Sequence, residues 1–419
     1  MENKKSKNIW YVGLLSFFGG ISQDIFAPIL PVYLTSILGF DKTVVGIAEG
    51  IVTASSNFFA IVAGYLADKF KKQKPIIFLG YFLSMVGRVC LVFFTSIGSV
   101  VGLRLLDGTG KGIKEPPKDV LIAGSSEKDV RGKSFGIATM LDTLGSVAGP
   151  LILFVLLWIF EKSGVASKPL YDNILFFSAI PLIITLLLIF KLRELPKSSV
   201  IASHSEAIQG EGTDSGLPRR FAPRNDNTSL PTTFYIFIFI IIIFTLGNSS
   251  DAFLILRAKN LGITLLEIPL VIALFNFVYA LAAVPFGSLS DKIGRVPTLI
   301  IGWLAYTLVY FGFAVATHAA LIWFLYAFYG IYYAISMGVS KAFLADIVSP
   351  NHRGRAFGIY GMTVGLTTLP ASFFAGFMWD KFGAQVPFYF GATMSLIACT
   401  LLFIFSQKYL KKLDKQGII

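Results

Sequence analysis

Long apolar runs separated by short polar breaks dominate the chain. The runs Leu182–Phe190 and Phe234–Leu246 contain no charged residue, and a helix needs about 20 mostly apolar residues to cross a bilayer. Counting the runs between breaks predicts an all-α polytopic membrane protein with twelve spanning helices. The predicted spans are 10–38, 43–67, 75–97, 99–125, 133–160, 172–193, 232–257, 266–290, 297–317, 320–347, 354–379 and 386–407.

One polar segment divides these spans into two sets of six. Residues 194–231 are rich in Gly, Pro and Ser and lack apolar periodicity, which is typical of a flexible linker. We therefore expect an N-terminal six-helix bundle at 1–193, a cytoplasmic linker at 194–231 and a C-terminal six-helix bundle at 232–419.

The distribution of basic residues explains the net charge of +12. Only 14% of the residues are charged, whereas a soluble domain is nearer a quarter charged. With both termini placed in the cytoplasm, 24 of the 36 Lys and Arg residues fall on that side and six fall on the other. This asymmetry follows the positive-inside rule. We expect a multi-pass protein of the cell (inner) membrane with cytoplasmic termini and no nucleic-acid partner.

Short motifs recur in the two halves at a nearly constant offset. GYLADKFKKQKP at 64–75 aligns with GSLSDKIGRVP at 287–297, and RGKSFG at 131–136 aligns with RGRAFG at 353–358. Two halves repeated in the same orientation are typical of pseudo-symmetric transporters that bind their solute between the halves.

On these motifs the chain resembles the major facilitator superfamily over essentially its whole length. The signature after the family's second helix is matched at Gly64, Leu66 and Asp68, but Lys71 stands where the family prefers Gly. The resemblance implies alternating access and a gating network of Asp and basic residues on the cytoplasmic side, although the motif could also be a topological anchor. The gating residues it implies are Asp68, Lys69, Arg131, Asp291, Arg295 and Arg353.

A second motif, GSVAGP at 145–150, is similar to the family's antiporter motif. Small residues four apart also let helices approach closely in lipid, so helix packing explains the motif nearly as well. It favours an exporter only weakly.

Charged residues inside the spans are the candidate functional groups, because a charge in hydrocarbon must face a cavity or a partner. Asp24, Arg104, Asp251 and Lys341 fall on the first, fourth, seventh and tenth spans, which line the central cavity in the family this chain resembles. The candidates for proton coupling are Asp24, Asp251, Glu49, Asp142, Arg104 and Asp107. The candidates for substrate binding are Gln23, Lys111, Asn248, Lys341 and Tyr333.

The most charged stretch within a span is RLLDGTGKGIKEPPKDV at 104–120. On a helical projection its charged residues lie within an arc of about 140°. A phosphate-binding loop is excluded because the stretch lacks the glycine–lysine–serine/threonine pattern and follows no strand. We interpret it as a polar face toward the cavity, with Arg104 and Asp107 deepest and with Lys114–Asp119 as a possible structural salt-bridge ladder.

The residue types found inside the spans limit which groups could carry a proton or catalyse a reaction. The three histidines, His204, His318 and His352, fall in loops or the linker, so any proton carrier in the spans is a carboxylate. No metal-spaced cluster or nucleophile–base pair is present, and we expect no enzyme activity, metal or cofactor.

The expected function is secondary transport of a small organic solute across the lipid bilayer, coupled to protons, by a monomer. Efflux antiport of a drug or metabolite is favoured. Uptake or exchange of an anionic metabolite, and a receptor that transports nothing, stay open as alternatives.

Overall fold

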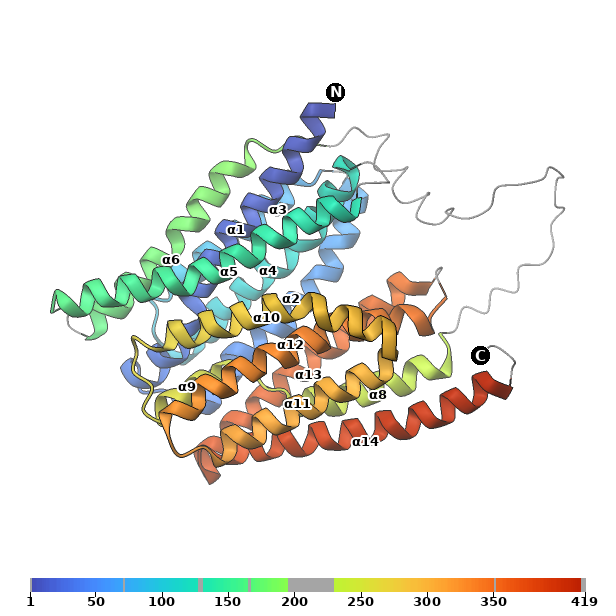
Figure 1. Ribbon diagram of the computed structural model, residues 1–419. Helices are drawn as coiled ribbons and strands as arrows, with labels where there is room; N and C mark the ends of the chain where they lie inside the picture. The colour runs from blue at the N-terminus through green and yellow to red at the C-terminus, as the bar shows by residue number, and fades with distance from the viewer. Residues whose placement is uncertain are drawn as a thin grey trace.

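The chain is helical almost throughout the residues that its computed structural model describes, which are 2–70, 72–126, 131–164, 167–194, 230–349 and 352–415 (Figure 1). The N-terminal bundle comprises α1 (Glu2–Val32), the short π-helix η1 (Tyr33–Ile37), α2 (Lys42–Phe70), α3 (Lys74–Cys90), α4 (Ile97–Ser125), α5 (Arg131–Lys162) and α6 (Ser167–Ile189). The C-terminal bundle comprises α8 (Thr232–Gly247), α9 (Ala252–Asn260), α10 (Ile268–Ile293), α11 (Arg295–Val315), α12 (Ala319–Ile347), α13 (Arg353–Phe382) and α14 (Val386–Lys415).

These helices confirm the predicted all-α fold of two six-helix halves. Within the described ranges, ten segments are long and apolar enough to cross a membrane. The other two predicted spans fall short of that measure for simple reasons: α3 has 17 residues, and α4 carries the charges of 104–119. Most of the predicted linker, 194–231, lies outside the described residues.

One predicted span differs, because 232–257 is two helices rather than one. The chain leaves the helix at Asn248 and resumes it as α9 after Asp251. Side chains from other helices form hydrogen bonds with the backbone groups at the break. Tyr306 Oη donates to the Gly247 carbonyl at 2.8 Å, and the Ser250 N–H donates to Ser372 Oγ at 3.1 Å. Irregular backbone at membrane depth needs such partners.

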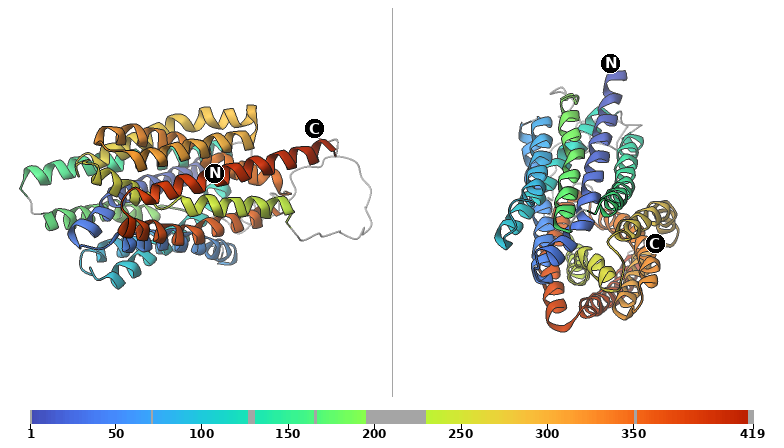
Figure 2. Two further views of the ribbon diagram at one scale, coloured as in Figure 1. Left: turned by 90° about the horizontal axis from the view of Figure 1, so that it is seen from below. Right: turned by 90° about the vertical axis from the view of Figure 1, so that its left-hand side faces the viewer.

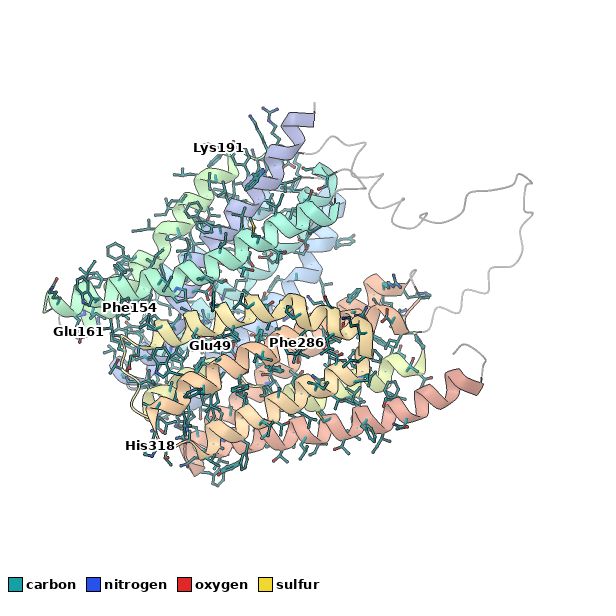
Figure 3. All side chains as sticks on the ribbon, in the orientation of Figure 1. Glu49, Phe154, Glu161, Lys191, Phe286 and His318 are labelled. Carbon is teal, nitrogen blue, oxygen red and sulfur yellow. The ribbon has the colours of Figure 1, made fainter. Side chains whose placement is uncertain are left out.

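The two bundles lie side by side (Figure 2). In the N-terminal bundle α1 packs on α5 and α6, and α4 packs on α2 and α3; between the bundles α2 packs on α13 and α5 packs on α10. We call the end that carries both termini the linker end and the opposite end the far end. Lys191 marks the first, and Glu161 and His318 mark the second (Figure 3).

Glycines bring α2 and α13 into backbone contact toward the far end. A β-carbon added to Gly46 would lie 2.7 Å from the Ser372 carbonyl carbon, and one added to Gly376 would lie 2.6 Å from the Lys42 carbonyl carbon. Side chains at these positions would force the helices apart, so the close approach of the bundles here depends on glycine.

Candidate functional site

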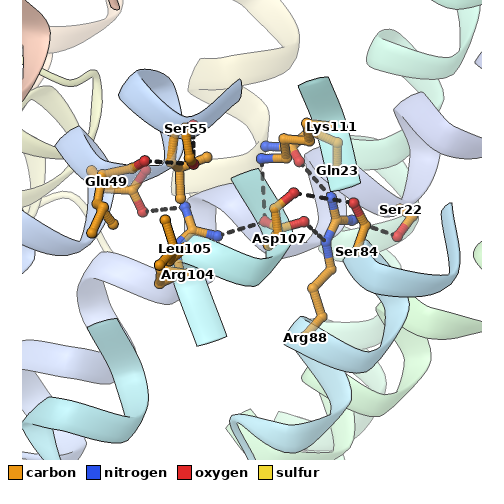
Figure 4. A network of polar contacts seen from close by, with 12 residues as sticks. Ser22, Gln23, Glu49, Ser55, Ser84, Arg88, Arg104, Leu105, Asp107 and Lys111 are labelled. Carbon is orange, nitrogen blue, oxygen red and sulfur yellow. Dashed lines mark hydrogen bonds and ion pairs between the residues drawn. The ribbon is translucent and has the colours of Figure 1, made fainter. Parts of the chain in front are cut away.

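A buried ionic network joins α2, α3 and α4 (Figure 4). Asp107 accepts a hydrogen bond from Arg104 Nη1 at 2.8 Å and one from Arg88 Nε at 3.3 Å, and Lys111 Nζ lies 3.3 Å from the same carboxylate. Arg104 Nη2 also donates to Glu49 Oε1 at 2.9 Å. Three basic groups therefore converge on Asp107, which is 1% exposed. This arrangement suits a fixed counter-ion better than a proton carrier.

Helix α1 completes the network from the other side. Arg88 donates from Nη1 to Ser22 Oγ and from Nη2 to Gln23 Oε1, both at 2.7 Å. The guanidinium groups of Arg88 and Arg104 lie 5.1 and 5.2 Å from the centre of the Phe26 ring. Gln23, predicted to bind substrate, is thus engaged with a buried arginine.

A polar cavity of about 360 Å³ opens within the N-terminal bundle. It brings together four of the predicted site residues: Gln23, Asp24, Lys111 and Asp142. Three more charged residues of α4, Lys114, Glu115 and Lys118, also line it. The remaining residues of its lining are Ser16, Gly19, Gly20, Ser56, Tyr81 and Ser146.

The salt-bridge ladder expected for Lys114–Asp119 forms only in part. Lys118 Nζ lies 2.9 Å from Glu115 Oε2 and donates to Ser16 Oγ at 3.0 Å. Lys114 instead lies over the ring of Tyr81, and Asp119 lines a different cavity. Helix α4 also continues through both of its prolines.

Asp24 is positioned by the glycine-rich motif on α5. A β-carbon added to Gly149 would lie 2.8 Å from Asp24 Cβ, so α5 can approach α1 here only with glycine at that position. Ser146 of the same motif lines the polar cavity together with Asp24.

The junction cavity, about 120 Å³ in volume, lies where the two bundles meet. Asp24 of the N-terminal bundle and Asp251 of the C-terminal bundle both line it. Tyr329 Oη donates to Asp251 Oδ1 at 2.6 Å. The remaining lining residues are Ala27, Pro28, Leu254, Ile255, Ile272, Phe275, Asn276 and Tyr326, so no basic side chain belongs to the lining.

A larger space of about 830 Å³, which we call the aromatic cleft, separates α2 and α4 from the C-terminal bundle. Three predicted substrate-binding residues, Asn248, Lys341 and Tyr333, line it together with Asp119. Six of its 21 lining residues are aromatic. The aromatic residues of the lining are Phe244, Trp303, Tyr332, Tyr333, Phe357 and Tyr360.

The structure describes the side chains of only two of the six predicted gating residues. The side chains of Asp68, Lys69, Arg131 and Asp291 lie outside the described part of the chain. Of the others, Arg295 Nε lies 3.4 Å from Asp346 Oδ2, and Arg353 Nε donates to the Ala345 carbonyl at 3.1 Å. These two contacts lie within the C-terminal bundle.

The sequence interpretation missed a contact between the bundles at the far end, which we call the far-end clasp. Asp380 of α13 accepts hydrogen bonds from the backbone N–H groups of Lys42 and Thr43 at 3.2 and 2.8 Å and from Thr43 Oγ1 at 2.7 Å. The carboxylate thereby caps the start of α2 across the bundle boundary. The sequence pattern did not mark Asp380 as a candidate, because the predicted span ended at residue 379 and left Asp380 in a loop.

Two further hydrogen bonds join the bundles. Lys259 Nζ donates to Ser36 Oγ at 2.5 Å near the far end, and Asn276 Nδ2 donates to the Ser146 carbonyl at 2.7 Å beside the junction cavity. Together with the clasp they hold the bundles together from the far end to the junction cavity. Figure 1 shows the bundles diverging from there toward the linker end.

Comparison with known proteins agrees with this architecture. The family model for the Major Facilitator Superfamily matches residues 12–256 and 233–417. An uncharacterised MFS-type transporter from Methanocaldococcus jannaschii is 33% identical over 407 residues, which are 96% of this chain and 95% of the relative. A proton-coupled antiporter flippase, LtaA, from Staphylococcus haemolyticus is 22% identical over 413 residues, covering 91% and 92% of the two chains. A crystal structure of a mutant of the nucleoside transporter NupG has a TM-score of 0.74 at 15% identity, covering 95% of this chain and 99% of that one.

Proposed function

The chain belongs to the Major Facilitator Superfamily and is a multi-pass membrane transporter, and from this premise we propose that it moves a small organic solute by alternating access, coupled to protons. The observation that carries the proposal is the junction cavity, where one carboxylate from each bundle faces the same small space.

The coupling chemistry follows from that pair. Two ionised carboxylates that face one cavity with no basic side chain in its lining repel each other, and a bound proton removes the repulsion. Because Asp24 and Asp251 belong to different bundles, any motion that separates the bundles also separates the pair. Proton binding and bundle movement are then linked, which is what a coupled transporter requires.

The wider space toward the linker end offers the solute access to the aromatic cleft from that side. If that end is cytoplasmic, as the distribution of Lys and Arg predicts, the aromatic cleft receives solute from the cytoplasm in this conformation. Its aromatic lining suits an amphipathic solute. The contact of the α5 motif with Asp24 and the proton-coupled antiport named for the Staphylococcus haemolyticus relative also favour efflux antiport.

Uptake or exchange of an anionic metabolite is the second candidate, favoured by the three lysines of the polar cavity, Lys111, Lys114 and Lys118. Lys111 and Lys341, the two basic residues among the predicted substrate-binding residues, line different cavities. They therefore do not form one anion site in this conformation.

Reconstitution tests the proposal. A thermal-shift screen of metabolites and drugs at two pH values first identifies a solute. The purified protein is then placed in liposomes that contain a pH-sensitive dye, and proton movement is recorded when that solute is added. We expect Asp24→Asn and Asp251→Asn each to reduce solute-driven proton flux by about ten-fold or more, since each removes a proton-binding group.

Asp41→Asn is the matched control, because Asp41 is an exposed carboxylate at the far end that lines none of these cavities. Its flux should stay within about two-fold of the unmodified protein, as surface substitutions usually have small effects. Full proton flux in both cavity variants contradicts the assignment. A protein that binds solutes yet moves neither solute nor protons is a receptor instead.

A further inference from the structure

The polar cavity contains one ammonium group, that of Lys114, for which the described residues provide no ion pair. Among the described residues Lys111 pairs with Asp107 at 3.3 Å and Lys118 pairs with Glu115 at 2.9 Å, but Lys114 forms no ion pair within 4.0 Å. The Lys114 ammonium lies 4.3 Å from the centre of the Tyr81 ring, and its side chain is only 9% exposed.

Close packing of α3 on α4 holds Lys114 in this position. A β-carbon added to Gly80 of α3 would lie 2.8 Å from Lys114 Cβ and 2.8 Å from the Gly110 carbonyl oxygen. The stem of Lys114 is therefore enclosed between two helices, with Tyr81 beneath the ammonium. The charge is presented to the cavity that Lys114 lines rather than to bulk water or lipid.

The neighbouring carboxylates do not take this place. Glu115, Asp24 and Asp142 line the same cavity, but none of them lies within ion-pair distance of Lys114, and Glu115 pairs with Lys118 instead. A buried cation without a paired carboxylate is costly unless an anion joins it. An anion that entered the cavity could therefore pair with the buried ammonium group of Lys114.

The polar cavity and the aromatic cleft adjoin along two helices. On α2, Ser56 lines the polar cavity and Asn57 lines the cleft; on α4, Lys118 lines the cavity and Asp119 lines the cleft. Consecutive helical residues differ in height by only about 1.5 Å, so the two spaces lie at the same depth. A solute that occupied both would need its polar and apolar parts at opposite ends.

We propose that the polar cavity binds the anionic group of the transported solute, with Lys114 as its counter-ion. The solute class is then an amphipathic organic acid, with a carboxylate or phosphate in the polar cavity and an apolar body against the aromatic cleft. This inference rests on the proposed transport function and names its substrate class.

Calorimetric titration of the purified full-length protein in detergent tests the inference, with empty micelles as the blank. The probes share one apolar body: 2-naphthoate, 2-naphthyl phosphate, 2-naphthylmethylamine and 2-naphthalenemethanol. We expect the two acids to bind at least about ten-fold more tightly than the amine and the alcohol, because a charge-assisted contact is strong in a buried site. This comparison uses the unmodified protein and does not depend on the folding of a variant.

Substitution then locates the site. Lys114→Gln should weaken naphthoate binding by about ten-fold or more, Lys114→Arg should retain most of it, and Lys168→Gln at the exposed far end should leave it unchanged. Tighter binding of the amine, no binding of either acid, or unaltered affinity in a folded Lys114→Gln protein overturns the proposal. The binding assay does not require transport, so the two proposals can fail separately. Loss of proton flux in liposomes with Lys114-dependent binding intact contradicts the proposed transport function alone, and proton flux without Lys114-dependent binding contradicts the anion site alone.

Discussion

The far-end clasp should control how often the transporter opens at that end. Asp380 accepts three hydrogen bonds from the start of α2 in the other bundle, and all three must break when the bundles separate there. Asp380→Ala removes every acceptor. Asp380→Asn keeps one side-chain oxygen and loses the negative charge, so it should have an intermediate effect.

The size of the effect follows from what the carboxylate does. It acts as the N-terminal cap of α2, and loss of such a cap costs about 1 to 2 kcal/mol in exposed or partly exposed helices. Because the cap exists only while the far end is closed, the whole loss falls on that state. The ratio of open to closed far end should rise by about five- to thirty-fold in Asp380→Ala.

Distance measurements between spin labels can record this shift. Lys168 and Lys381 are exposed and belong to different bundles near the far end, so labelled cysteines at these two positions report the separation of the bundles. The native cysteines, Cys90 and Cys399, are replaced first. Asp380→Ala should enlarge the long-distance population, and Asp380→Asn should enlarge it less.

Glu161→Gln provides the control, since it removes an exposed carboxylate from the same end and belongs to α5 rather than to the start of α2. A distance distribution in Asp380→Ala that matches that of Glu161→Gln would refute the reasoning. So would an increase of equal size in both variants, because the effect would then come from surface charge and not from the cap.

Two further substitutions test the buried parts of the fold. Asp107→Asn leaves Arg88 and Arg104 without their shared counter-ion and should destabilise the protein by about 3 to 5 kcal/mol, seen as a large fall in melting temperature. Gly46→Leu places a side chain against the Ser372 backbone and should prevent closure of the far end, which abolishes transport while solute binding persists.

Each of these has its own check. Glu161→Gln removes a carboxylate that is exposed at the far end and should change stability by less than about 1 kcal/mol; a loss as large as that of Asp107→Asn would contradict the role of burial. Gly98→Leu is the control for Gly46→Leu, because a side chain at Gly98 meets no neighbouring atom. Normal transport by Gly46→Leu would show that the glycine contact is dispensable.

The helices could be predicted because apolar runs of spanning length are a local property of the chain. The break between α8 and α9 was missed although its residues, Gly247 to Asp251, are typical of turns. The length of the apolar run outweighed them. The hydrogen bonds that stabilise the break come from Tyr306 and Ser372, which are distant in sequence.

Many residues of the candidate site could be predicted from the sequence, but the contacts between them could not. The helical projection of 104–120 placed its charges on one face. It did not reveal that Arg88 of α3 would form an ion pair with Asp107, or that the Lys114 ammonium would lie over the Tyr81 ring. Such pairings depend on helix packing, which short-range patterns do not encode.

The two bundles differ in what holds their interiors together, and this affects how each tolerates mutation. In the N-terminal bundle, loss of Asp107 leaves the buried Arg88 and Arg104 without their shared carboxylate, so a change within this network destabilises the fold before it can alter function. In the C-terminal bundle, the cleft is lined by aromatic rings such as Tyr332 and Trp303, and exchanging one ring for another changes shape without stranding a charge. Solute preference can therefore be altered through the rings of the cleft at little cost in stability, whereas the ionic network tolerates little change.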